Sequence, residues 1–454
     1  MSGRIYSGAT PAEVRRDLAP LVDFRAEGLP LAELEKLCRE RLVPHLMRYD
    51  APEFQSMFNA FSEEGADFGA RLALSYNQGV TNWQVSPGGA TLEEMCGGAV
   101  CRLFKLAPEA EATFMYAGTY ANLQGLYLAL HRLAEIRGFD FGLRGLRGFG
   151  DPGRLAVLAS ADAHFSIRHA VRTLGLGDES IVSIPTDANG RMSAAALTKT
   201  ISELSATRDI VCIVATAGTT STGAVDPITA VADISEQAGL WLHVDGAYGL
   251  AYSLVPEWAP LFAGIERADS LVWDPHKQLG VPIPNSLLFL RRGADFHRMS
   301  LHSAYFNRPD DEAPNPGLKS PPSTRMFSAL ALAASLRRQG MVKVVERLRA
   351  PLEAIRKMAE RLAGENDIEL LHRPDTGILC FRLKPPGLSE AGLDVLQQKI
   401  YDRIMSGGER TISLTKIRGR KALRLVAVSP AVTTEALLET IAAVRRAAAK
   451  EDEP

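Results

Sequence analysis

The chain has 454 residues, of which 51 are basic and 53 acidic, so its formal net charge is −2. A hydrophobic fraction of 46% and a charged fraction of 23% are typical of globular proteins, which excludes collagen-like, wholly disordered and polybasic chains. The longest apolar runs are far shorter than the roughly 20 residues of a membrane span. We therefore expect a large globular protein that binds neither nucleic acid nor membrane.

The N-terminus and the cysteines indicate a cellular compartment. Residues 1–18 lack the apolar stretch of about 7–15 residues that marks a secretory signal. The five cysteines are scattered, with no CxxC pair and no nearby histidine to complete a zinc site. We expect a cytoplasmic protein with reduced thiols and no metal.

The predicted elements begin with helices. Apolar side chains recur at helical spacing over residues 32–43, and we predict a helical capping segment over residues 1–80. A second helix is expected over residues 123–133, directly after a Gly-Thr pair at Gly118 and Thr119.

Residues 81–340 alternate strand-length and helix-length segments. Six short runs are rich in Val, Ile and Leu without polar alternation, and helix-length segments such as 224–239 separate several of them. The runs are residues 155–159, 181–184, 210–217, 241–244, 270–273 and 286–290. This pattern predicts a large α/β domain with a mainly parallel sheet and helices on both faces.

The remaining segments are a loop and a smaller domain. Residues 307–323 hold five prolines, which excludes a continuous helix or a central strand and predicts a long loop. Beyond residue 340 we expect helices over 341–362 and 433–450, and strands near 378–383 and 423–428. Residues 341–454 are therefore predicted to form a small C-terminal α+β domain.

Polar groups follow the ends of several predicted strands, where open parallel sheets bind ligands. Asp245 follows one run, and His276 and Lys277 follow another. Burial lowers the pKa of a lysine, as an amine that forms a Schiff base requires. A buried carboxylate keeps a pyridine nitrogen protonated, so Lys277 and Asp245 are the minimum pair for pyridoxal 5'-phosphate.

Two further groups have alternative interpretations. Gly118 and Thr119 at the start of a helix could bind a phosphate or could be an ordinary helix cap. His164 could stack on a planar ring or could be a hydrogen-bonded structural residue.

These residues occur in strings that resemble the group II pyridoxal-phosphate-dependent amino acid decarboxylases, the family of aromatic amino acid and glutamate decarboxylases. The resemblance covers about residues 80–340, in order. The strings are Ser86-Pro87, Gly118-Thr119, Ala121-Asn122, Asp162-Ala163-His164, Gly218-Thr219-Thr220, His243-Val244-Asp245-Gly246-Ala247-Tyr248 and Asp274-Pro275-His276-Lys277.

The resemblance implies a fold and a set of cofactor contacts. The fold is the aminotransferase-like fold type I, a homodimer with active sites at the subunit interface, in which residues 1–80 would wrap the partner. Lys277 would form the Schiff base and Asp245 would pair with the pyridinium nitrogen. His164 and Ala247 would sandwich the ring. Four more residues would contact the cofactor: Gly118, Thr119 and His276 at the phosphate, and Thr219 at the cofactor hydroxyl or the substrate carboxylate.

The same resemblance implies a reaction, decarboxylation of an L-amino acid to an amine and carbon dioxide. Tyr305 matches the family's proton donor on a mobile loop, and Arg325 matches the basic residue after that loop. We expect Trp83, Ser86, Phe54 and Arg325 to contact the substrate. Tyr305 and Arg325 could instead be a packing tyrosine and a solvated arginine, and Trp83 and Phe54 could be core. Carbon-carbon lyase and decarboxylating aldehyde synthase reactions stay open, as do aromatic, acidic and aliphatic substrates.

Overall fold

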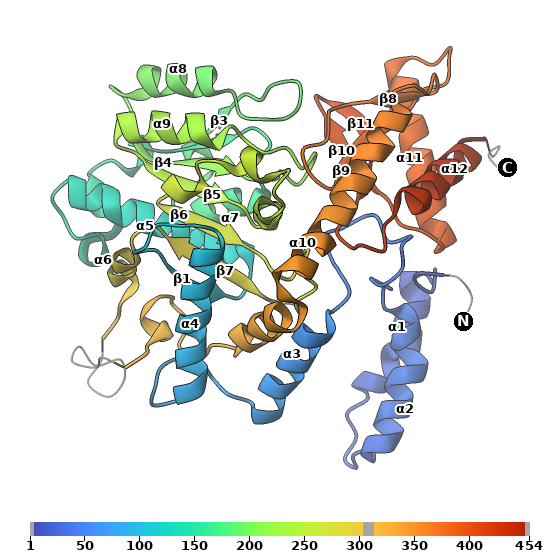
Figure 1. Cartoon of the computed structure of the whole chain (residues 1–454), viewed down its shortest axis with the longest axis horizontal. Helices are drawn as coiled ribbons and strands as arrows, with labels where there is room; N and C mark the ends of the chain where they lie inside the picture. The colour runs from blue at the N-terminus through green and yellow to red at the C-terminus, as the bar shows by residue number, and fades with distance from the viewer. Residues whose placement is uncertain (1–3, 303–312, 450–454) are drawn as a thin grey trace. The chain divides into compact units, whose positions relative to one another are not determined.

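The computed structural model describes residues 4–302 and 313–449 (Figure 1). It contains two compact units. The larger unit comprises residues 62–349 with 374–376, and the smaller comprises residues up to 61, residues 350–373 and residues from 377 onward. The sequence placed boundaries at residues 80 and 340 instead, and that three-part division stays a prediction.

The larger unit is built on a seven-stranded sheet with the order β1-β7-β6-β5-β4-β2-β3. Strand β7 runs antiparallel to both of its neighbours, β1 and β6, and the other pairs are parallel. The strands are β1 (Glu111–Met115), β2 (Leu155–Ser160), β3 (Ile181–Ile184), β4 (Asp209–Thr216), β5 (Trp241–Asp245), β6 (Ser270–Trp273) and β7 (Ser286–Leu290).

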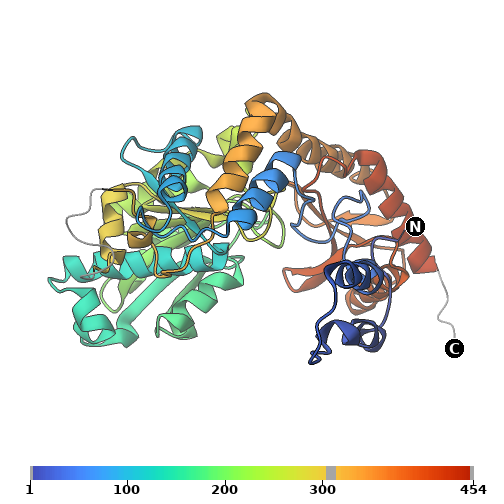
Figure 2. The same ribbon diagram turned by 90° about the horizontal axis from the view of Figure 1, so that it is seen from below.

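Helices cover this sheet on both faces, as Figures 1 and 2 show. Helix α5 packs on β4 to β7 and on α7, whereas α9 packs on β4 and β5 and on α8. The helices of this unit are α3 (Glu64–Tyr76), α4 (Pro87–Leu103), α5 (Gly118–Ile136), α6 (Phe141–Arg144), α7 (Phe165–Thr173), α8 (Ala194–Leu204), α9 (Ile228–Ala238) and the first part of α10 (Ser328–Leu362). Helix α10 is kinked at Gly340, where φ is +69°.

The predicted fold class is confirmed, and all six predicted strands are present. They are β2 to β7, which are almost entirely buried apart from the edge strand β3, because their Val, Ile and Leu side chains face helices on both sides. The seventh strand, β1, was not predicted.

The smaller unit has its own sheet and core. Its four strands are antiparallel in the order β10-β11-β9-β8. They are β8 (Ile368–Leu370), β9 (Ile378–Leu383), β10 (Ser413–Ile417) and β11 (Arg420–Val426). The helices are α1 (Pro11–Leu18), α2 (Leu31–Arg41), the part of α10 from residue 350 onward, α11 (Glu390–Gly407) and α12 (Thr434–Ala449). The predicted strands near 378–383 and 423–428 are β9 and β11. Within the described residues, none of the helices has the length and apolar character needed to cross a bilayer.

Candidate active site

The carboxyl ends of β5 and β6 and the start of α5 meet at one edge of the large sheet. Because β7 is antiparallel to both β1 and β6, those two strands point the same way, and α5 begins at the edge where β6 ends. A Cβ atom on Gly118 would lie 2.7 Å from Oδ2 of Asp274, so only glycine fits there. The first residue of α5 is thus packed against the loop that carries Lys277.

Lys277 and His276 lie in the loop after β6. The Lys277 ammonium is 3.1 Å from Asp274 Oδ2, and its side chain is 20% exposed. His276 Nδ1 donates to the Asn285 carbonyl at 2.6 Å, which directs Nε2 toward Asp274 at 3.8 Å. The amine is shielded but still reachable from solvent, as a group that reacts with a small molecule must be.

Asp245 is the last residue of β5 and is buried. The Ala247 N–H donates to its Oδ1 at 3.1 Å, and Asn122 Nδ2 donates to its Oδ2 at 2.8 Å. Hydrogen bonds from neutral donors favour the charged form of a carboxyl group. Asp245 is therefore arranged as a buried carboxylate whose remaining lone pairs can bind a cationic N–H.

His164 caps the N-terminus of α7. Its Nδ1 accepts from the Ser166 N–H at 3.2 Å and lies 2.8 Å from the Ser166 hydroxyl. Burial lowers the pKa of His164, and nearby Lys277 lowers it further, while Asp245 opposes the shift. The imidazole is consequently neutral, with its proton on Nε2, and its flat face is held in a fixed orientation.

The N-terminus of α5 is suited to an anion. Within the described part of the chain, no side chain caps this helix, whose N-cap residue is Ala117. The first N–H groups of the helix and its dipole are therefore available to a phosphate, and Gly118 permits close approach. Thr119, half-buried beside Gly118, adds a hydroxyl.

Ala247 and Thr219 lie near the same edge of the sheet. Ala247 is 8% exposed, and its carbonyl accepts from the Asp274 N–H at 3.2 Å, which joins the loops after β5 and β6. Thr219 is fully buried in the turn after β4, where its hydroxyl contacts Thr222 at 2.9 Å and accepts from the Ala224 N–H. A cofactor contact by Thr219 stays a prediction.

Three of the expected substrate residues lie on two segments that pair with each other. Val80 N–H donates to the Arg325 carbonyl at 2.9 Å, and Trp83 N–H donates to the Pro314 carbonyl at 3.0 Å. Trp83 is 46% exposed, whereas Ser86 is buried at the N-cap of α4. The Arg325 side chain is buried and its nitrogens bind Glu93, Ser320 and backbone carbonyls. A substrate contact by these three residues stays a prediction.

For the other two sequence-predicted residues, Phe54 and Tyr305, a role at the site stays a prediction. Phe54 lies in the smaller unit, buried with Ile5 and Ala51 and packed on Tyr49 at a ring separation of 4.8 Å. Tyr305 lies outside the described residues.

Sequence reasoning missed two polar residues behind the site, Asn122 and His243. Both are buried, and His243 Nε2 lies 2.9 Å from Asn122 Oδ1. Both occur in the strings that carried the family resemblance, but without an assigned role. No sequence signal marked Asn122, because the predicted helix began at residue 123, whereas α5 begins at Gly118 and buries Asn122, which then needs hydrogen-bond partners.

The residues present fit pyridoxal phosphate. A shielded lysine, a buried carboxylate, a neutral imidazole and an uncapped helix N-terminus lie around one edge of the sheet. These groups match the aldehyde, the pyridine nitrogen, the ring face and the phosphate of this cofactor. Fold and site together define a pyridoxal-phosphate-dependent enzyme of fold type I.

Comparison with known proteins gives the family. The pyridoxal-dependent decarboxylase conserved domain matches residues 12–384, and the chain belongs to this family. It is 29% identical to L-2,4-diaminobutyrate decarboxylase of Acinetobacter baumannii, over 82% of this chain and 75% of that protein. It is 28% identical to human acidic amino acid decarboxylase GADL1, over 94% and 82% of the two chains.

A solved structure agrees in fold. Mouse CSAD superposes with a TM-score of 0.91 at 24% identity, covering 99% of this chain and 94% of that one. The chain is thus a pyridoxal-phosphate-dependent amino acid decarboxylase, a carboxy-lyase, as the sequence predicted.

Proposed function

We propose that this enzyme releases carbon dioxide from a free L-amino acid with Lys277, Asp245 and His164 as its central residues. The observation that carries this proposal is a pair of contact series at one edge of the sheet. One series runs from Gly118 through Asp274 to Lys277. The other runs from Asp245 through Asn122 and the Ser166 hydroxyl to His164. Lys277 would hold the cofactor covalently, Gly118, Thr119 and His276 would bind its phosphate, and Thr219 its hydroxyl.

The chemistry divides between the cofactor and the chain. When bound, pyridoxal phosphate supplies the electron sink for the pair released by loss of carbon dioxide. Asp245 keeps a proton on the ring nitrogen, because a buried carboxylate stabilises an adjacent cation. His164 and Ala247 hold the two ring faces. The packed loops after β5 and β6 exclude water from this side of the site.

Protonation of the substrate carbon decides the product. We assign it to Tyr305 on the strength of the family resemblance. The described segment that follows supports the assignment, because Tyr116, two residues before Gly118, donates its hydroxyl to the carbonyl of Thr324. This contact fixes one end of the loop beside the start of α5. Without the tyrosine proton, oxidation of the substrate carbon by dissolved dioxygen would compete, giving an aldehyde, ammonia and hydrogen peroxide. Tyr305→Phe is therefore expected to divert product from amine to aldehyde.

The relatives and one exposed aromatic residue indicate which substrates to test. The diaminobutyrate decarboxylase relative makes L-2,4-diaminobutyrate the first compound to test, and the GADL1 relative adds acidic amino acids. The aromatic Trp83, which is 46% exposed, is the argument for including aromatic amino acids.

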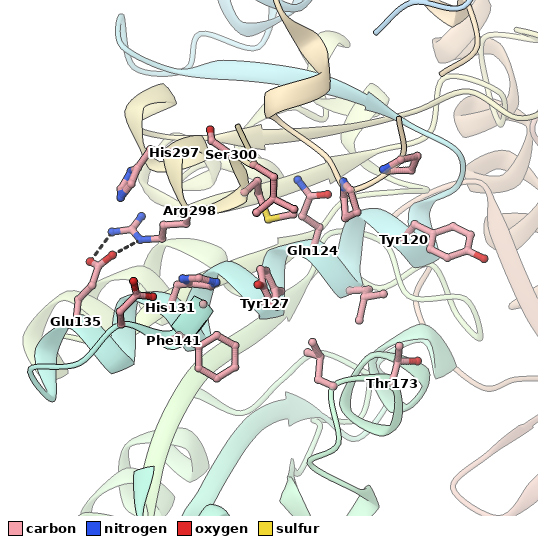
Figure 3. A pocket seen from close by; sticks show the side chains of 18 of the residues that line it. Tyr120, Gln124, Tyr127, His131, Glu135, Phe141, Thr173, His297, Arg298 and Ser300 are labelled. Atoms are coloured by element: carbon pink, nitrogen blue, oxygen red, sulfur yellow. Dashed lines mark hydrogen bonds and ion pairs between the residues drawn. The ribbon is translucent and has the colours of Figure 1, made fainter. Parts of the chain in front are cut away.

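We further infer that the enzyme is a homodimer. A groove of about 1430 Å³ runs along α5, lined on one side by Tyr120, Gln124, Tyr127 and His131, as Figure 3 shows. The other lining residues include Thr173 of α7 and residues of the 3-10 segment Gly293–Met299, which lie on opposite sides of α5 in this view. Apolar residues at its rim stay exposed, among them Leu301 at 82%. An apolar groove of this size beside an active site supports a second subunit as its cover.

A cytoplasmic location is also proposed. All five cysteines lie in the described part of the chain, none of them forms a disulfide there, and four are buried. Burial raises the pKa of Cys96 and Cys101 to about 12, so these thiols resist oxidation. This thiol chemistry is typical of proteins from a reducing compartment.

One experiment tests the central proposal. Carbon dioxide release is measured from diaminobutyrate, acidic, aliphatic and aromatic L-amino acids, for the wild type and for Lys277→Ala, with amine and aldehyde quantified. We expect release from one side-chain class, with amine as the product, and loss of both release and visible absorbance in the variant. Release by Lys277→Ala at the wild-type rate would contradict the assignment. Sedimentation that finds only monomer at active concentrations would contradict the dimer.

A further inference from the structure

Asn122, in the second turn of α5, joins the two groups that face the cofactor. Its Nδ2 donates one hydrogen to Asp245 Oδ2 at 2.8 Å and the other to the Ser166 hydroxyl, also at 2.8 Å. The Ser166 hydroxyl in turn lies 2.8 Å from His164 Nδ1. One side-chain amide is therefore bound to the Asp245 carboxylate and, through one hydroxyl, to the His164 imidazole.

The orientation of this amide is determined by its partners. Asp245 is a carboxylate and can only accept, so the Asn122 atom that faces it must be the nitrogen. The Ser166 hydroxyl accepts from that nitrogen and donates to His164 Nδ1, which already accepts the Ser166 N–H. The Asn122 oxygen then faces His243, which must donate to it.

A second series of hydrogen bonds fixes Asn122 from behind. Trp241 Nε1 donates to the Ser270 hydroxyl at 2.8 Å, and that hydroxyl lies 2.7 Å from His243 Nδ1. Burial lowers the pKa of His243 to about 4, although Asp245 opposes the shift, so the ring is neutral at physiological pH. Ser270 therefore donates to Nδ1, and His243 Nε2 donates to Asn122 at 2.9 Å. Every hydrogen bond from Trp241 to Asp245 points the same way.

Close packing of α5 on β5 keeps Asn122 and His243 within hydrogen-bonding distance. A Cβ atom on Gly125, one turn after Asn122, would lie 2.5 Å from the His243 ring. Helix α5 can approach β5 this closely only because residue 125 is glycine. Asn122 and His243 are almost completely excluded from solvent, so water cannot replace the bonds between them.

We propose that Asn122 is the positioning residue of this active site, which holds the Asp245 carboxylate and the His164 ring in one fixed arrangement for the cofactor. The proposal rests on the roles given above to Asp245 and His164. Its physical basis is that Asp245 loses a donor to its charged form when the amide is absent. The carboxyl then competes with the pyridine nitrogen for the proton, and the ring becomes a weaker electron sink.

Two substitutions at the same position separate positioning from packing. Asn122→Leu removes both donors and the acceptor. Asn122→Asp keeps the shape and the acceptor for His243 but places a second carboxyl beside Asp245. When two carboxyl groups are in contact, they share one proton, and the pKa for the loss of that proton is strongly raised. While the proton is present, the new carboxyl can still donate a hydrogen bond to Asp245, as the amide did. Burial lowers the pKa of both His164 and His243, the other titratable groups in the network, so neither ring gains positive charge as pH rises.

Turnover gives the first readout. For Asn122→Leu we expect kcat to fall at least about tenfold at every pH, with KM changed by less than about twofold, because the electron sink and not substrate binding is affected. For Asn122→Asp we expect kcat near the wild-type value at pH 6 and at least about tenfold lower at pH 8.5, as the shared proton is lost. The visible circular dichroism of the bound cofactor should follow the same pH curve.

The cofactor-free protein gives an independent readout. The new carboxyl of Asn122→Asp has a higher pKa in the folded state than in the unfolded state. Its contribution to stability is therefore present at low pH and lost as pH rises through the folded-state pKa. The thermal midpoint of Asn122→Asp relative to wild type should fall between pH 5 and pH 8.5, whereas that of Asn122→Leu should stay at a constant offset.

A matched control removes a buried amide elsewhere. Gln397 in the smaller unit is fully buried and bonds to the backbone of Leu383 and Leu393. Gln397→Met should lower the thermal midpoint without changing kcat or the circular dichroism. Wild-type kcat and dichroism in both Asn122 variants, or equal pH-independent losses in the two, would overturn the proposal. If Lys277→Ala also keeps its absorbance, the proposed function itself has failed.

Discussion

Arg325→Leu is expected to lower the free energy of unfolding by about 3–5 kcal/mol, the cost of leaving one member of a buried ion pair without its partner. The Arg325 side chain is 4% exposed and that of Glu93, its partner, is 2% exposed. Nε donates to the Val80 carbonyl at 3.1 Å, and Nη2 to the Phe114 carbonyl at 3.0 Å and to Thr113 Oγ1 at 3.1 Å. Leucine replaces none of these bonds.

A double variant tests whether the lost stability comes from the unpaired charge of Glu93. In Glu93→Leu with Arg325→Leu no buried charge remains, so a large part of the lost stability should return. Arg71→Leu is the control, because Arg71 is 77% exposed and pairs with Asp67 only at the surface of α3. That change is expected to cost less than about 1 kcal/mol.

The assay is urea unfolding of the cofactor-free protein followed by tryptophan fluorescence. All four tryptophans (Trp83, Trp241, Trp258 and Trp273) belong to the larger unit, so the signal reports the unit that contains Arg325. A loss below about 1 kcal/mol, or a double variant no more stable than Arg325→Leu, would refute the reasoning, since both outcomes contradict an uncompensated buried charge.

The effect should depend on pH in a defined direction. Burial raises the pKa of Glu93 above its ordinary value, and Arg325 opposes part of this shift. Without Arg325 the folded-state pKa of Glu93 lies above the unfolded value, so the stability of the variant is retained at low pH and lost as pH rises. The difference between wild type and Arg325→Leu should therefore shrink from pH 8 to pH 5.

Three further predictions concern the site. Gly118→Ala places a methyl carbon 2.7 Å from the Asp274 carboxylate and should raise the cofactor dissociation constant at least about tenfold in titrations of the cofactor-free protein. Gly98→Ala, where the nearest atom is 3.6 Å away, should leave that constant unchanged, and equal affinities for the two variants would contradict the reasoning. Gly125→Ala forces α5 away from His243 and should destabilise the larger unit by about 1–3 kcal/mol, as measured by urea unfolding. Burial lowers the pKa of His243 to about 4, so its contribution to the free energy of unfolding is present above pH 6.5 and lost as pH falls toward 4. His243→Gln has no titratable group at this position, and its free energy of unfolding should therefore decline less over that pH range.

The sequence predicted the large sheet well because its strands are nearly continuous apolar runs. Strand β1 (Glu111–Met115) was not predicted because it begins with a charged residue and includes a threonine. Its pairing with β7 also depends on a segment far along the chain. The smaller unit shows the same limit. Gln55 N–H bonds to Thr411, 356 residues away, and no local pattern reports such a contact.

The candidate site was predictable to the extent that single residues carry its chemistry. Lys277, Asp245 and His164 are recognisable because a lysine, a carboxylate and a histidine each perform a distinct task. Asn122 was not recognisable, since its role depends on three partners from β5 and α7 that become neighbours only in the folded sheet. The charge of Arg325 suggested a substrate contact, which stays a prediction. Its buried ion pair with Glu93 and its bond to the Val80 carbonyl could not be predicted from the sequence, because these partners are more than 200 residues away.

The position of β7 between β1 and β6 also affects how the protein is made. During synthesis β1 leaves the ribosome early, but its neighbour in the sheet follows only after residues 116–285. At about 5–20 residues per second, that interval lasts roughly 10–30 s. The first residue of α5 packs against Asp274, in the loop after β6, so the phosphate-binding end of this helix is complete only after residue 274 has been made. We therefore expect cofactor capture to be a late event in the synthesis of the chain.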